Sequence, residues 1–160
     1  MKKLILLLFI PLVSFGQTYK EVMSISSVDM FKKVVIENGY EFDNTDEEGW
    51  VTYGYNIVKD SIDGNRSSKW AYYNINDNRF TLSFSRSNIL STFLNTDPDN
   101  SENPYDLIVK SIKEKCNYYT IMNYNGTDYV TYSCPESKYD GKIGFMIEED
   151  QGFIKHFPRD

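Results

Sequence analysis

The chain has 160 residues, of which 23 are acidic and 17 basic, for a formal net charge of −6 at pH 7. Nucleic-acid binding depends on clustered Lys and Arg side chains that contact phosphates. No such cluster occurs along this acidic chain, so the composition excludes nucleic acid as a partner. The length is sufficient for one domain with a hydrophobic core.

The N-terminus has the pattern of a bacterial secretory signal peptide. Lys2 and Lys3 precede an apolar run, and small residues lead up to an expected cleavage site after Gly16. Cleavage would divide the chain into a signal at residues 1–16 and a single exported domain at 17–160. The formal charge would become −8, because two lysines and no acid are removed. The apolar run is too short for a lasting membrane anchor. We therefore expect a periplasmic or secreted protein with no membrane insertion after cleavage.

The exported part is predicted to consist of two copies of one unit. The stretches "VDMFKKVVIE" and "YDLIVKSIKE" align Asp29 with Asp106, and both carry apolar residues at helical spacing. Repeat one is expected at about 22–87, a polar linker at 88–102 and repeat two at about 103–158.

Capping residues predict where the two helices begin and end. Ser26 or Ser27 is the expected start of the first helix, and Gly39 is its expected stop. Asn103 is the expected cap of the second helix, with Pro104 in its first turn.

Strand patterns follow each predicted helix in the same order. A short strand is expected around residues 40–42, and "WVTYGY", "KWAYY" and "RFTLSFS" are matched in the second unit by "DYVTYS", "KIGFMI" and "FIKHF". Apolar and polar residues alternate in these stretches, which is typical of strands with one buried face. The sequence therefore predicts an α+β fold of two tandem helix-plus-antiparallel-strands repeats, with the helices packed on one face of a largely antiparallel sheet.

The two cysteines stand at the ends of one predicted hairpin, "CNYYTIMNYNGTDYVTYSC". Asn125-Gly126 is a strong turn signal, because both residues tolerate positive φ. A two-residue loop places Asn117 opposite Cys134, whereas a bulged glycine places Cys116 opposite Cys134. Either register brings the thiols within disulfide range, and an exported chain favours the Cys116–Cys134 bond over two buried, reduced thiols.

No catalytic residue, metal site or cofactor is predicted. His156 is the single histidine, and it is expected to be a partly exposed strand residue with no partners for a triad or a zinc site. The acidic stretches at 43–49 and 97–103 do not match the EF-hand pattern. Solvated turns are favoured there over a weak calcium site.

Aromatic side chains are the positive functional signal. All 13 tyrosines and both tryptophans lie after residue 16, and alternation prevents them all from occupying one buried face. Trp50, Trp70, Tyr72 and Tyr119 are the candidate partner-binding residues of the opposite face, because Tyr and Trp are enriched at protein interfaces. The alternative is cross-strand aromatic pairing that only stabilises the sheet.

An exported chain of this size, with tandem helix-plus-strands units and a small disulfide loop, resembles the β-lactamase inhibitor protein family. That resemblance implies one curved sheet whose concave, aromatic-rich face binds a partner protein.

The sequence thus predicts an exported, non-enzymatic binding protein of inhibitor or immunity type. Its protein partner is unidentified, and we expect it to be basic because the surface of this protein is acidic. The alternative is a small-molecule or lipid carrier with an aromatic-lined cavity.

Overall fold

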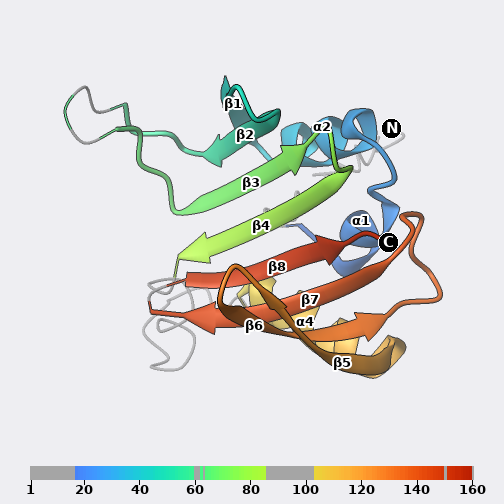
Figure 1. The fold of residues 1–160 in the computed structure, drawn as a ribbon. Helices are drawn as coiled ribbons and strands as arrows, with labels where there is room; N and C mark the ends of the chain where they lie inside the picture. Colours follow the sequence, from blue (N-terminus) through green and yellow to red (C-terminus); the bar gives the residue numbers. More distant parts are fainter. Residues whose placement is uncertain (1–16, 60–61, 63, 86–102, 150, 160) are drawn as a thin grey trace, which may run out of the picture.

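The computed structural model shows how the chain folds from Gln17 onward (Figure 1). The described residues are 17–59, 62, 64–85, 103–149 and 151–159. The predicted signal peptide and the predicted linker lie outside them.

The predicted helices are present, and their capping residues are those expected from the sequence. Helix α2 (Val28–Glu37) begins after Ser27, whose hydroxyl accepts a hydrogen bond from the Met30 N–H at 3.3 Å. Helix α4 (Pro104–Lys115) begins after Asn103, whose side chain accepts from the Tyr105 N–H at 2.9 Å. Both caps satisfy a backbone donor that the helix leaves unpaired.

A further short helix, α1 (Tyr19–Ser24), was not predicted. Its start is a capping box, in which Thr18 and Glu21 satisfy each other's backbone N–H groups. No helix among the described residues is long and apolar enough to cross a bilayer.

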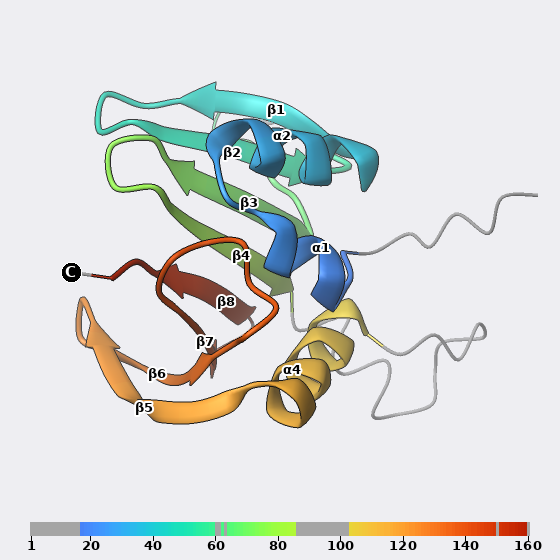
Figure 2. The same cartoon turned by 90° about the vertical axis from the view of Figure 1, so that its right-hand side faces the viewer.

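The strands form one eight-stranded antiparallel sheet in the order β1-β2-β3-β4-β8-β7-β6-β5. An α+β fold with a large antiparallel sheet is therefore confirmed. Figure 2 shows β1 and β5 at the two ends of the sheet, and β4 pairs with β8 at its centre. The strands are β1 (Tyr40–Thr45), β2 (Trp50–Tyr55), β3 (Lys69–Asn74), β4 (Arg79–Ser85), β5 (Asn117–Tyr124), β6 (Thr127–Ser133), β7 (Lys142–Glu148) and β8 (Gln151–Phe157).

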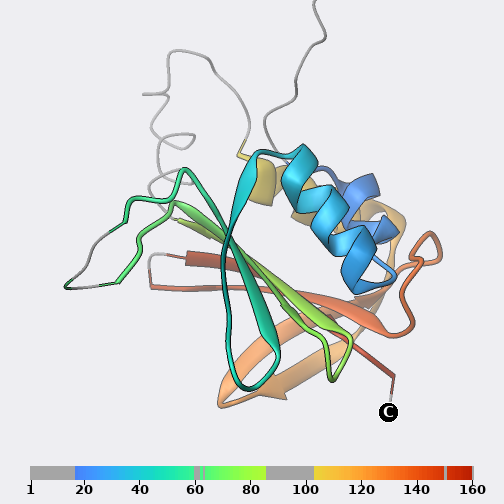
Figure 3. The ribbon, with the colours of Figure 1, turned by 90° about the horizontal axis from the view of Figure 1, so that it is seen from above.

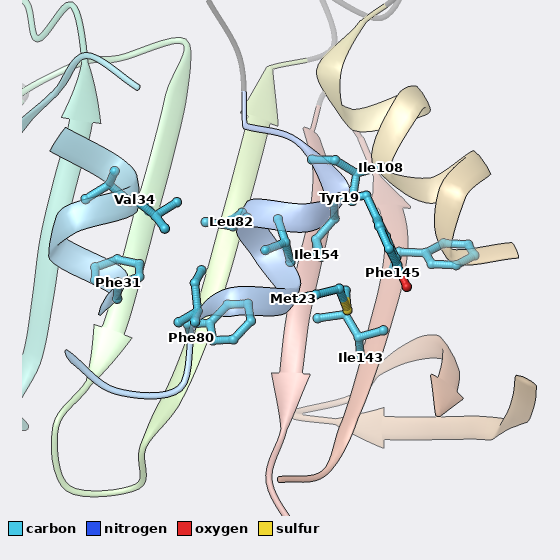
Figure 4. Close-up of a cluster of buried hydrophobic side chains, with 14 of the residues drawn as sticks. Tyr19, Met23, Phe31, Val34, Phe80, Leu82, Ile108, Ile143, Phe145 and Ile154 are labelled. Atoms are coloured by element: carbon cyan, nitrogen blue, oxygen red, sulfur yellow. The ribbon is translucent and has the colours of Figure 1, made fainter. Parts of the chain in front are cut away.

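The hydrophobic core joins helix residues to alternate strand residues. The Phe31 ring of α2 lies 5.2 Å from the Tyr73 ring and 6.0 Å from the Tyr53 ring. Figure 4 shows side chains from α1, α2 and α4 converging on Leu82 and Ile154, which are fully buried. Figure 3 shows the helices together on one side of the strands. The helices therefore do not cover the other side of the sheet.

A disulfide closes the base of the β5–β6 hairpin, as the sequence predicted. The Cα atoms of Cys116 and Cys134 are 4.4 Å apart. Asn125 and Gly126 form the two-residue turn, with φ of 51° and 86°. Positive φ at both positions matches the twist of a tight hairpin.

The register of this hairpin contains a bulge, but not at the glycine where the sequence allowed for one. Pairing shifts between Tyr118 and Thr120, so Asn117 faces Ser133 rather than Cys134. The extra residue is Tyr119, on the outermost strand of the sheet. Bulges increase local twist and redirect side chains.

His156 is buried, so its predicted partial exposure was wrong. It lies on the core side of β8, where its ring stacks 5.2 Å from Phe80 and its Nε2 is 2.8 Å from the Asp140 carbonyl oxygen. Burial lowers the pKa of His156 below its ordinary value. The histidine is a packed core residue.

We predict that C116S/C134S lowers the free energy of unfolding by about 3 kcal/mol, because the bond closes a loop with a sequence separation of 18. Urea unfolding followed by circular dichroism would measure this loss. The reduced wild-type chain is the control, and it should lose a similar amount. Equal stability of the oxidised and reduced chains would contradict the prediction.

Candidate functional site

The open face is the side of the sheet that points away from the core. The pairing of adjacent strands aligns one row of open-face residues across six strands. That row contains Thr52, Tyr72, Thr81, Lys155, Gly144 and Thr131, in the order β2, β3, β4, β8, β7, β6.

Three of the four predicted partner-binding residues lie on the open face, and two of them, Trp70 and Tyr72, are in contact. Trp50 belongs to β2, whereas Trp70 and Tyr72 belong to β3 and stack with their ring centroids 6.4 Å apart. Gly54 pairs with Trp70, and a Cβ at Gly54 would lie 2.8 Å from the Trp70 ring. The glycine therefore lets the indole lie close against β2. All three rings are half-buried, so part of each remains available for contact.

The fourth predicted residue, Tyr119, lies apart from this group. It occupies the bulge on β5, and 55% of its surface is exposed. The Lys142 Nζ lies 4.6 Å from the centre of its ring. The sheet thus holds Tyr119 at its edge, away from the two tryptophans.

Lys155 is the residue that sequence reasoning missed. It lies in the middle of β8 on the open face and is only 4% exposed. Its Nζ donates a hydrogen bond to Thr81 Oγ1 at 3.2 Å. The sequence signal was available, because Lys155 stands between Phe153 and Phe157 at the alternate positions of one strand face.

The β5–β6 hairpin covers this lysine. Strand β6 pairs with β7 only over Val130–Tyr132, so the outer part of the hairpin leaves the sheet. Figure 1 shows its tip in front of β7 and β8. A flat sheet would separate β5 from β8 by about 14 Å. Nevertheless, the Tyr124 ring centre lies 3.9 Å from Lys155 Nζ, so the hairpin must curl over the open face.

A second cation meets the same tyrosine ring. The Arg79 guanidinium carbon lies 5.1 Å from the centre of the Tyr124 ring, and its Nη2 lies 3.5 Å from Asp77. The Arg79 Nε is buried without a hydrogen-bond partner. Trp50 is a further aromatic neighbour of the lysine, with its ring centre 5.7 Å from Lys155 Nζ. We call Arg79, Lys155 and the ring of Tyr124 the cationic site.

Among the described residues, Lys155 is buried without a negative partner. Within the described part of the chain, no carboxylate lies within ion-pair distance of its Nζ. Burial, and then repulsion from Arg79, lower the pKa of Lys155 to about 8. Aromatic faces attract cations and offset part of this cost. Even so, the open face carries a concealed positive charge on an acidic protein.

A hollow of about 530 Å³ lies on the other side of the sheet, at the end nearest His156. Tyr73 and Phe80 form part of its wall, and Asp77, Asp140 and other charged residues also line it. It is therefore a partly polar groove rather than a closed apolar cavity. No cluster of three or more His, Cys, Asp or Glu residues that could hold a metal ion occurs among the residues described.

No protein-family model, curated protein or solved structure matches this chain. The side chains of the open face and their surroundings are therefore the basis for proposing a function.

We predict that Lys155 makes the stability of the protein depend on pH. The folded lysine loses its proton near pH 8, whereas the unfolded lysine keeps it to about pH 10.4. The unfolded state then binds more protons between these values, so the free energy of unfolding rises with pH in this window.

In urea unfolding, wild type should gain roughly 1 to 3 kcal/mol relative to K155M between about pH 7.5 and 9.5. The lowered pKa of Lys69 is common to both proteins and cancels in the comparison. Parallel pH profiles for the two proteins would show that Lys155 titrates normally.

Proposed function

We propose that the chain is an exported, non-enzymatic binding protein whose open face binds a partner protein, as an inhibitor or an immunity protein does. The observation that carries the proposal is the set of half-buried rings on the open face: Trp70 and Tyr72 stack on β3, and Trp50 lies beside the cationic site. Large, stiff aromatic side chains and arginine dominate the energetics of protein interfaces. The disulfide fits a periplasmic or secreted location.

We further propose that the two halves of the sheet are tandem repeats, as in the β-lactamase inhibitor protein family. The sequence alignment places Val51-Thr52-Tyr53 over Val130-Thr131-Tyr132. These segments lie in β2 and β6, each the second strand of its half. In both, the threonine points to the open face while the flanking residues pack against the core. Equivalent residues at equivalent places support a repeat.

The open face changes the expected charge of the partner. Net charge alone favoured a basic partner, but the open face itself holds Lys155, Arg79 and Lys142. The partner surface that meets these residues should therefore be acidic at its centre.

The carrier alternative has less support. Carriers enclose their ligand in a largely apolar cavity. The hollow beside His156 has charged residues in its lining, and the open-face aromatics do not line it.

We predict that a photo-crosslinking amino acid at position 72 captures a partner in the cell envelope or culture medium of the producing bacterium. The same amino acid at position 107, a partly exposed site on α4, is the control. One specific adduct from position 72 and none from position 107 is expected. Equal capture from both positions, or none from position 72, would contradict binding through the open face.

Once the partner is identified, W50A and W70A should each weaken the affinity of the protein for it about tenfold or more, since buried aromatic anchors dominate interfaces. Both rings are half-buried, so the melting temperature should fall by less than about 5 °C. L107A is the matched control and should leave affinity unchanged. A large loss of stability without loss of affinity would make these rings part of the core, and the proposal would fail.

A further inference from the structure

Two cations on neighbouring strands share one aromatic ring. Arg79 of β4 and Lys155 of β8 approach the Tyr124 ring within 5.1 Å and 3.9 Å of its centre. Arg79 is two residues from Thr81, which pairs with Lys155, so both side chains project from the open face. The fold thus brings two like charges together under one aromatic ring.

Their hydrogen-bonding capacity is not filled. The Lys155 ammonium carries three protons, and Thr81 Oγ1 accepts one of them. The Arg79 Nε is buried with no acceptor, although its guanidinium also contacts Asp77. Buried donors and buried charges usually have partners, because leaving them unmet costs free energy. Two enclosed cations with spare donors are therefore suited to an anion.

The surroundings favour the carboxylate of an acidic side chain over a small free anion. Trp50 and Tyr124 provide apolar surface on which the methylene groups of an acidic side chain would pack. Arg and Lys donate short, charge-assisted hydrogen bonds to carboxylate oxygens. The negative net charge of the chain opposes loose accumulation of anions, so an anion must be brought in by other contacts.

We propose that the cationic site binds a carboxylate, and that this carboxylate is an acidic side chain of the partner protein. The inference rests on the proposed function, since the aromatic group beside the site would supply the rest of the interface. The acid enters beside Arg79 and Trp50, which are both half-buried. Entry requires the hairpin tip to move, which breaks the ring contacts of Tyr124 and Tyr129 with Phe157 but no β6–β7 pairing at Thr127 to Tyr129.

The site can be tested without the partner. N-acetyl-glutamate amide is the carboxylate probe, and N-acetyl-glutamine amide is its uncharged control. Each is titrated into the mature chain at constant ionic strength, while nuclear magnetic resonance follows the Trp50 indole N–H and the Lys155 side chain. The carboxylate should give saturable shifts, with a Kd in the millimolar range, and should raise the pKa of Lys155. The amide should give none.

Variants separate this site from general charge effects. K155M should weaken binding of the glutamate probe at least tenfold. K142M removes another open-face lysine that contacts a tyrosine ring, and it should bind the probe as wild type does. Equal responses to the two probes, or equal losses in both variants, would overturn the proposal. Tighter binding of inorganic phosphate than of the carboxylate would overturn the assignment of ligand class.

The same variants distinguish this inference from the proposed function. If position 72 captures a partner and K155M binds it as tightly as wild type, the carboxylate site is wrong while the binding face stands. If the glutamate probe binds and position 72 captures nothing, the partner is wrong while the site stands.

Discussion

The ladder between β4 and β8 is the constraint on which both the core and the open face depend. It joins the two four-stranded halves of the sheet, and its register sets Leu82 beside Ile154 and Thr81 beside Lys155. The first pair is fully buried against the helices, and the second lies at the centre of the open face. Because side chains alternate along a strand, a slip of one residue would move the lysine into the core and Ile154 out of it. One register therefore produces both the hydrophobic core and the buried charge.

The β5–β6 hairpin connects the disulfide to that charge. Cys116 ends α4 and bonds to Cys134, so the base of the hairpin is tied to a helix that packs in the core. The tip carries Tyr124, whose ring covers Lys155 and lies 6.4 Å from the Phe157 ring. Between base and tip, the bulge and the short pairing with β7 let the strands curl. The hairpin that holds Tyr124 over Lys155 is therefore anchored to α4 at its base by the disulfide.

Local sequence patterns predicted the elements whose causes are local. Ser27 and Asn103 start helices because their side chains reach backbone donors two or three residues away. Asn125-Gly126 predicts the turn because only two residues are involved. The cationic site escaped prediction because it needs the β4–β8 pairing and the hairpin curl, which bring together residues far apart in the chain. The buried His156 escaped for the same reason, since its environment comes from other elements.

An acidic protein with a concealed positive site presents different charges at different distances. At long range a proposed partner meets the field of an acidic chain, with a formal net charge of −6 that becomes −8 with the expected cleavage, and this field slows the approach of acidic surfaces and of free anions. At contact distance the aromatic rings exclude water, and the charges of Arg79 and Lys155 act in a weaker screening medium. An anion then binds well only if its carrier also makes contacts that overcome the repulsion. Such an arrangement sacrifices association rate and gains selectivity, because an anion without the matching surface is rejected. In the proposed role the burial of Lys155 selects a partner, whereas a hydrophobic residue at that position would stabilise the sheet at lower cost.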